Sequence, residues 1–153
     1  MTGTGTPSTE QRLTLRSQLS ELSLASAWVE RLASQYAIPD DTRFAMNLCL
    51  EEVLSNIIRH GYSGQSDRSI NIRFSSLQEG CFVFVIDDEA PLFNPLDAPY
   101  GPPPINPLEE IPIGGRGITL LREFAQTLEY EARPTGNRLS VGFRIGDSRA
   151  RKG

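Results

Sequence analysis

The sequence predicts an α+β fold, a two-layer α/β sandwich in which helices pack on one face of a mixed β-sheet. Three observations support this. Two early segments have the apolar spacing of amphipathic helices, later segments alternate apolar and polar residues as half-buried strands do, and one more helix interrupts those strands. The predicted order is strand, helix, helix, strand, strand, loop, helix, strand, strand. Two layers around one core bury such elements.

Two helices are expected in the first half of the chain. The first runs from an N-cap at Ser20 to about Tyr36. The second runs from a cap at Asp40 to about His60, where Gly61 ends it. The first has an apolar stripe and the second a broad apolar face: Leu24, Trp28, Leu32 and Tyr36, and then Met46, Leu50, Val53, Leu54 and Ile57.

Strands are expected on both sides of these helices. Leu13 and Leu15 alternate in a first strand over 12–16, and 82–86 is a continuously apolar segment typical of a central strand. A third helix follows a glycine cluster, with helical spacing from Ile118 to Ala125. The remaining strand signals are Ile70, Ile72 and Phe74, then Leu128 and Tyr130, and then Leu139, Val141, Phe143 and Ile145.

Size and composition indicate one ordinary globular domain. The chain has 153 residues, 39% hydrophobic and 22% charged, with a net charge of −4. This acidic balance argues against a nucleic-acid-binding module. The sequence contains no segment long enough to span a membrane and no signal-peptide core, and its two cysteines lie in apolar segments, so we expect a cytoplasmic protein without a membrane partner. The expected domain is 11–146, between a disordered leader (1–10) and a basic tail (147–153).

A proline-rich loop separates the predicted central strand from the third helix. Residues 94–113 contain seven of the eleven prolines and have no usable periodicity. A loop of this length in a compact domain is either a surface insertion or a functional lid. The motifs on both sides of it favour a lid.

The second helix carries polar groups in line. Glu52, Asn56 and His60 are spaced i, i+4, i+8, and Arg59 borders them. An asparagine oxygen suits Mg²⁺ that takes its other ligands from phosphates and water, and a carboxylate one turn away is placed to accept a proton. The same spacing also occurs on the solvent face of an ordinary amphipathic helix.

Two further motifs border the loop. The central strand ends in Asp87, Asp88 and Glu89, and a carboxylate there could accept a hydrogen bond from an exocyclic amine such as N6 of adenine while rejecting the oxygen of guanine. Gly115, Arg116 and Gly117 precede a helix, where free N–H groups and the helix dipole attract phosphate. Each motif alone also fits a plain turn or hinge.

In this order the motifs resemble those of the GHKL superfamily, and in particular its bacterial anti-sigma-factor serine/threonine-protein kinases. The resemblance covers about 13–145. The segment 52–62 (EVLSNIIRHGY) is similar to the family's N-box, 88–93 (DEAPLF) to its Asp-x-Gly-x-x-Phe box and 115–117 (GRG) to its second glycine box, while Gly136 and Asn137 stand where the third begins.

The resemblance implies a Bergerat ATP-binding fold that uses ATP and Mg²⁺. It assigns Glu52 as the general base and Asn56 as the Mg²⁺ ligand. The implied ATP contacts are Asn56, Arg59, Asp88, Ala90, Phe93, Gly115, Arg116 and Gly117. The implied partners are an anti-anti-sigma (STAS-like) protein, a sigma factor and a second copy of the chain.

The sequence also departs from the family's pattern. Ala90 replaces a glycine, Asn137 and Arg138 replace the usual Thr of the third box, and Pro112-Ile113 stands where some of these kinases have a lid arginine. Two functions therefore remain open: a serine kinase in partner switching, which Glu52 favours, and a nucleotide-dependent module that sequesters a regulator, which the departures favour. A histidine kinase is not expected, because the only histidine lies within the nucleotide helix.

Overall fold

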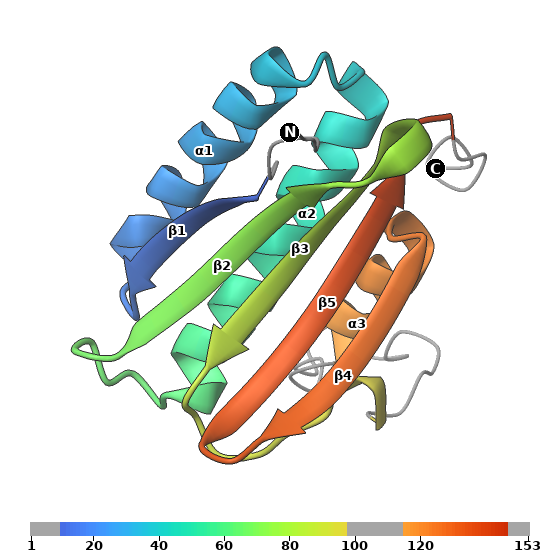
Figure 1. Ribbon diagram of the computed structural model, residues 1–153. Coiled ribbons are helices and arrows are strands. Elements are labelled where there is room, and N and C mark those ends of the chain that lie inside the picture. The colour runs from blue at the N-terminus through green and yellow to red at the C-terminus, as the bar shows by residue number, and fades with distance from the viewer. Residues whose placement is uncertain (1–9, 98–114, 147–153) are drawn as a thin grey trace, which may run out of the picture.

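The computed structural model describes residues 10–97 and 115–146 and confirms the α+β class. A five-stranded sheet of order β1-β2-β3-β5-β4 forms one layer, and the α-helices cover one of its faces (Figure 1). The main elements are β1 (Gln11–Arg16), α1 (Leu22–Gln35), α2 (Asp40–Asn56), β2 (Ser69–Ser76), β3 (Cys81–Asp88), α3 (Gly115–Phe124), β4 (Thr127–Arg133) and β5 (Gly136–Arg144).

The sheet is antiparallel at every described pairing, so the expectation of a mixed sheet was wrong. In the chain, the helices α1 and α2 lie between β1 and β2. As a pair they bring the chain back to the end of the sheet where β1 finishes, and β2 begins there. A single helix, α3, lies between β3 and β4 and makes these two strands parallel in direction, but β5 lies between them in the sheet. The crossover therefore creates no adjacent parallel pair.

Aromatic side chains join the two layers of the core. Trp28 on α1 packs against Phe74 and Phe84 of the sheet, with ring centroids 6.5 and 5.8 Å apart. Phe74 also stacks on Phe82 at 5.7 Å. Such pairs add about 0.5–1.5 kcal/mol each beyond the area they bury. Most residues expected to face the core from β2, β3 and β5 are buried: Ile70, Ile72, Phe74, Phe82, Phe84, Ile86, Leu139, Val141 and Phe143. Ile145, expected in the same row, lies just beyond β5 and is half-buried.

The first helix differs from expectation at its start. A 3-10 turn over Leu19–Glu21 precedes α1, so Ser20 is not its N-cap. The buried face follows i, i+3, i+4 spacing through Ala25, Trp28 and Val29, which leaves Leu24 49% exposed. The helix still packs on the sheet because the later members of the predicted stripe point inward.

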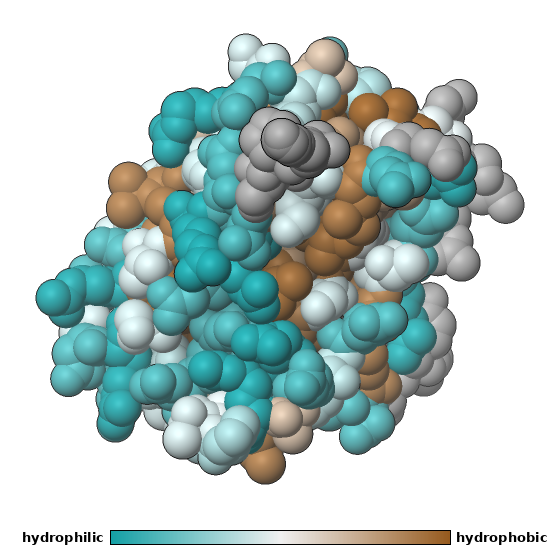
Figure 2. Space-filling model, viewed as in Figure 1, coloured by the Kyte–Doolittle hydropathy of each residue, from teal (hydrophilic) through white to brown (hydrophobic). Residues whose placement is uncertain are grey.

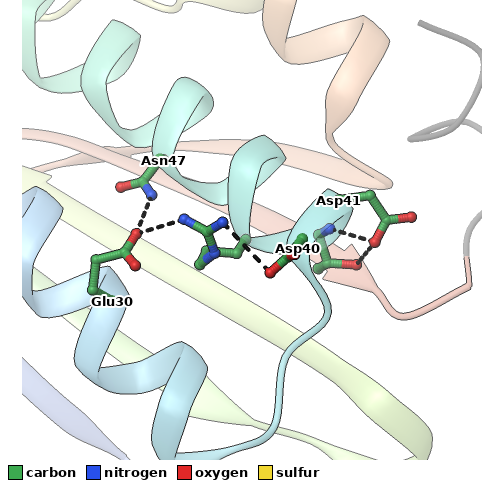
Figure 3. A network of polar contacts seen from close by, with 6 residues as sticks. Glu30, Asp40, Asp41 and Asn47 are labelled. Carbon is green, nitrogen blue, oxygen red and sulfur yellow. Dashed lines mark hydrogen bonds and ion pairs between the residues drawn. The ribbon is translucent and has the colours of Figure 1, made fainter.

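A polar network holds α1 against the start of α2 (Figure 3). The Glu30 carboxylate accepts hydrogen bonds from Arg43 at 2.9 Å and from the Asn47 amide at 3.1 Å. The hydrogen bond from Arg43 is the largest cause that lowers the pKa of Glu30, and desolvation, which would raise it, is outweighed. These solvent-exposed contacts fix the orientation of α2 more than they stabilise it.

The expected second helix changes form at its end. It is α-helical only to Asn56, and a π-helical turn (Ile57–Gly61) follows. The Tyr62 N–H donates to the Ile57 carbonyl at 2.8 Å, five residues earlier. His60 lies in this wider turn, beyond the α-helical part that holds Glu52 and Asn56. π turns are frequent at functional sites.

Among the described residues, the other sheet face carries no helix, and it is seen in Figure 2. An apolar stripe crosses it over β3 and β5 among polar side chains. Cys81, Val83 and Val85 alternate with the core residues of β3 and are half-buried. Of the two free cysteines, Cys49 is buried in α2, as expected of a small apolar residue.

Several expectations lie outside the described residues: most of the leader and lid (1–9 and 98–113), the side chain of Arg116 and the basic tail. The lid's first residues include a short 3-10 turn over Pro95–Asp97. Within the described ranges, no helix has the length and apolar character that crossing a membrane requires.

Gly136 opens β5 where a side chain has no room. Its φ is +152°, and a Cβ there would overlap the backbone carbonyl oxygen of Asp88. Gly64 also has positive φ, +83°, but nothing lies within 4 Å of a Cβ at that position. Substitutions at Gly64 and Gly136 therefore separate the cost of backbone strain from the cost of overlap with neighbouring atoms.

We expect Gly64→Ala to cost about 1 kcal/mol, because left-handed backbone disfavours a Cβ. Gly136→Ala should cost roughly 1–3 kcal/mol more, because the methyl group displaces β3. Urea unfolding of both variants measures this difference. Equal losses at the two positions would contradict the overlap.

Candidate functional site

A cavity of about 360 Å³ lies between the end of α2, the end of β3, α3 and the strands β4 and β5. This volume is within the range of small-molecule sites. Its lining is mostly apolar, with a few polar groups. The lining residues are Val53, Asn56, Ile57, His60, Gly61, Asp88, Ala90, Pro91, Leu92, Phe93, Pro95, Leu121, Tyr130, Asn137 and Leu139.

The two aspartates at the end of β3 face opposite sides of the sheet. Asp87 points to the open face, where Arg138 binds it through two nitrogens at 2.7 and 3.0 Å. Partial desolvation alone would raise the pKa of Asp87, but the contacts with Arg138 outweigh it and the pKa is lowered. Asp88 points inward and lines the cavity. The strand period of two therefore decides which carboxylate reaches a ligand.

Asp88 is 5% exposed and accepts two hydrogen bonds through the same oxygen. Oδ1 accepts from the Ala90 N–H at 2.9 Å and from the Asn137 amide at 2.8 Å. Among the described residues, no hydrogen bond reaches Oδ2. Burial raises the pKa of Asp88 despite these two donors. A buried carboxylate oxygen that lacks a donor, at the wall of a cavity, is a strong acceptor for a ligand N–H.

The end of α2 forms the wall opposite Asp88. Asn56 is half-buried and lines the cavity, and His60 reaches the same wall from the π turn although it is exposed. Glu52 is half-buried one turn before Asn56 and is outside the lining. Arg59 is exposed and is also outside it.

The replacement of glycine by Ala90 is accommodated by a neighbouring glycine. Ala90 is 5% exposed, and a Cβ placed on Gly61 would lie 3.0 Å from the Ala90 Cβ. The Ala90 methyl group therefore occupies space that Gly61 leaves free. Phe93, three residues on, is 54% exposed at the cavity mouth.

The predicted glycine cluster forms the first turn of α3 rather than a loop before it, because the helix begins at Gly115. Phe124, at the end of α3, packs edge-on against Phe44 near the start of α2, with centroids 6.0 Å apart. Leu121 lines the cavity beside Val53 and Asn56. These contacts show that α3 runs antiparallel to α2. The N–H groups of its first turn, which have no partner within the helix, therefore lie near the end of α2 that holds Asn56.

Three residues that shape the site were not among the predicted site residues. Tyr62, 4% exposed, donates to the Ser69 carbonyl at 2.8 Å and accepts from the Glu89 N–H at 2.7 Å. Asn137 and Tyr130 are hydrogen-bonded to each other at the cavity wall. The position of Tyr62 beside Gly61 was a weak sequence signal that it belongs to the site. The partners of Asn137 and Tyr130 gave no such signal, because they depend on strand register.

The arrangement suits a purine nucleotide with a cation at its phosphates. One wall has Asp88, whose Oδ2 accepts no hydrogen bond from the described residues, beside apolar side chains, and the opposite wall has Asn56. No group of three or more acidic, histidine or cysteine side chains that could hold a metal occurs in the described part of the chain. A cation at Asn56 would therefore need ligands from phosphate and water, as Mg²⁺ usually has.

Comparisons with known proteins place the domain in a family. The family model for the histidine kinase-like ATPase domain matches residues 15–143. The chain is 27% identical to the serine/threonine-protein kinase BtrW of Bordetella bronchiseptica over 114 residues, which is 74% of this chain and 79% of BtrW.

Solved structures show the same fold. One is a crystal structure of the RsbU and RsbW domains of Rv1364c from Mycobacterium tuberculosis, with a TM-score of 0.66 and 11% identity, covering 91% of this chain and 32% of that one. Another is a histidine kinase domain from a blue-light activated histidine kinase of Erythrobacter litoralis, with a TM-score of 0.51 and 16% identity, covering 95% of this chain and 68% of that one.

The family model covers most of the chain, including both walls of the cavity, and it confirms the GHKL resemblance seen in the motifs. Similarity to a serine/threonine kinase supports the anti-sigma-factor kinase branch of that superfamily, and use of ATP follows at the level of the family. The chain belongs to the histidine kinase-like ATPase domain family.

Proposed function

We propose that this protein is an ATP- and Mg²⁺-dependent protein-serine/threonine kinase of the anti-sigma-factor type. Its substrate is a serine on an anti-anti-sigma (STAS-like) protein in a partner-switching system. The named relative is a serine/threonine-protein kinase, which supports the reaction class. The acceptor, a sigma-factor partner, homodimer formation and a cytoplasmic location are parts of this proposal.

The observation that carries the proposal is the pair of polar groups on opposite walls of one cavity. Asp88 Oδ2 lacks a hydrogen-bond donor among the described residues, and it suits the exocyclic amine of adenine. Asn56 lines the same cavity from α2. A base held by Asp88 would direct its phosphates toward Asn56 and the start of α3.

The chain's residues divide the work of phosphoryl transfer. Asn56 would hold the Mg²⁺ that neutralises phosphate charge, and the first turn of α3, with Gly115, Arg116 and Gly117, would bind phosphate oxygens. Glu52, one helical turn from Asn56, would accept the proton of the attacking serine hydroxyl. Its place outside the cavity lining suits a base that meets a protein acceptor at the cavity edge. Arg59 is proposed as a phosphate contact from the exposed π turn.

Asn56→Ala should weaken binding of Mg²⁺–ATP at least roughly tenfold, the effect of losing about 1.4 kcal/mol. Asn47→Ala is the matched control, because Asn47 lies on the same helix but bonds Glu30 on α1. Calorimetric titration of both variants measures the effect. Equal affinities for the two variants would remove Asn56 from the metal site.

The kinase reaction is tested with labelled ATP and a purified STAS-domain protein from the same organism as the candidate acceptor. Transfer of label to a serine of that protein, mapped by mass spectrometry, is the expected result. A stable ATP-dependent complex without label would favour the second candidate, a sequestering module. The altered glycine-box residues Ala90 and Asn137 are the observations that favour it.

In the same assay, Glu52→Gln should keep ATP affinity and lose transfer by roughly 10²–10⁴-fold, the usual contribution of a general base. Glu51→Gln is the control, because Glu51 is the exposed neighbour on the same helix. It should transfer phosphate at the wild-type rate. A fully active Glu52→Gln protein would exclude Glu52 as the base.

Adenosine binding should weaken as the pH falls, because a protonated Asp88 no longer offers an anionic acceptor. Burial raises the pKa of Asp88, so the loss should begin above the ordinary aspartate range near about 3.9. Adenosine is the probe because it has no phosphates that titrate. In Asp88→Asn the weak remaining affinity should not follow this profile. A wild-type affinity that is constant down to the ordinary range would contradict the assignment.

A further inference from the structure

Asn137 is the most connected side chain of the cavity wall. It lies near the start of β5, is 7% exposed, and faces Asp88 directly across the β3–β5 pairing. Its side chain contacts the end of β3, the chain that follows β3 and the neighbouring strand β4. A buried carboxamide with this many partners is held in one orientation.

The surrounding groups decide which end of the amide faces Asp88. The nitrogen donates to Asp88 Oδ1 at 2.8 Å and to the Pro91 carbonyl at 3.1 Å, and lies 3.4 Å from the Ala90 carbonyl. The oxygen accepts from the Phe93 N–H at 2.9 Å and from the Tyr130 hydroxyl. A flipped amide would put its oxygen against three acceptors, so the nitrogen must face Asp88.

This orientation has a consequence for Asp88. Its Oδ1 takes both donors that the described residues direct at the carboxylate, the Ala90 N–H and the Asn137 amide. The carboxylate is thereby fixed in rotation about its C–C bond. Its other oxygen, Oδ2, is left as the acceptor at a cavity that Asp88 lines.

We propose that Asn137 is a positioning residue that sets base selectivity: by holding Asp88 Oδ1, it aims Oδ2 at the 6-position of a bound purine and makes the site prefer a 6-amino to a 6-oxo group. This inference rests on the proposed nucleotide site. Asn137 itself need not touch the base. A 6-oxo purine would face Oδ2 with a second acceptor, and an unpaired buried acceptor costs about 1–3 kcal/mol.

Base selectivity is measured as the ratio of affinities for ATP and ITP, in which an oxygen replaces the 6-amino group. We expect the wild-type protein to prefer ATP by roughly 10- to 100-fold, the equivalent of that cost. A purely structural role for Asn137 would lower both affinities together and leave the ratio unchanged. The ratio therefore separates positioning from folding.

The matched variants are Asn137→Thr and Asn137→Val, which have nearly the same shape and differ by one hydroxyl donor. Both lose the amide contacts to Pro91 and Phe93, so their stabilities fall together. The Thr hydroxyl can still hold the Asp88 carboxylate, directly or through one water. We expect the Thr variant to keep an ATP preference within about threefold of wild type and the Val variant to lose at least tenfold of it.

Tyr130→Phe is a milder second variant, which removes one of the two donors that orient the amide. It should reduce the ATP preference in the same direction, and it keeps the proposal testable if the position-137 variants do not fold. Asn71→Thr is the surface control, because Asn71 lies exposed on β2. It should leave the ratio unchanged.

The outcomes distinguish the two levels of inference. If the wild-type protein binds neither nucleotide, the proposed function fails. If it binds ATP selectively but the Thr and Val variants show equal ratios, the nucleotide site stands and the positioning role of Asn137 is overturned. An unchanged ratio in Tyr130→Phe would also count against that role.

Discussion

Asp88 and Asn137 are 49 residues apart in the chain and hydrogen-bonded across neighbouring strands. Their contact depends on the register of β3 and β5, which places the two residues opposite each other with both side chains on the helix-covered face. Gly136 maintains that register, because its missing Cβ lets β5 approach the Asp88 backbone. The position of Asp88 Oδ2 as an acceptor at the cavity wall follows from this pairing.

The second wall depends on the end of α2. The helix is amphipathic up to Asn56, and the π turn after it brings Ile57, His60 and Gly61 to the cavity. Gly61 in turn leaves room for the methyl group of Ala90. Ala90 departs from the family's pattern, yet the cavity stays open, because the Ala90 methyl group lies in the space that Gly61 leaves free.

Much of the fold could be predicted, because burial on one face imposes a period on each element. Alternation in β2 and β5 and the apolar face of α2 identified core residues that the structure buries. The parallel or antiparallel direction of neighbouring strands could not be predicted. It depends on where β5 inserts, and no local periodicity records that. Leu24 was assigned inward because it lies four residues before Trp28, but α1 begins after a 3-10 turn and Leu24 is exposed.

The sequence by itself determined the residue types of the site and their order, because helical spacing places Glu52 and Asn56 one turn apart and strand spacing separates Asp87 from Asp88. It also determined the family, through motifs that lie together in the chain. Only the tertiary structure decided that the Asn137 amide donates both to Asp88 Oδ1 and to the Pro91 carbonyl, just before the lid. Hydrogen bonds between strands depend on register, and register is a property of the packed sheet rather than of any one segment.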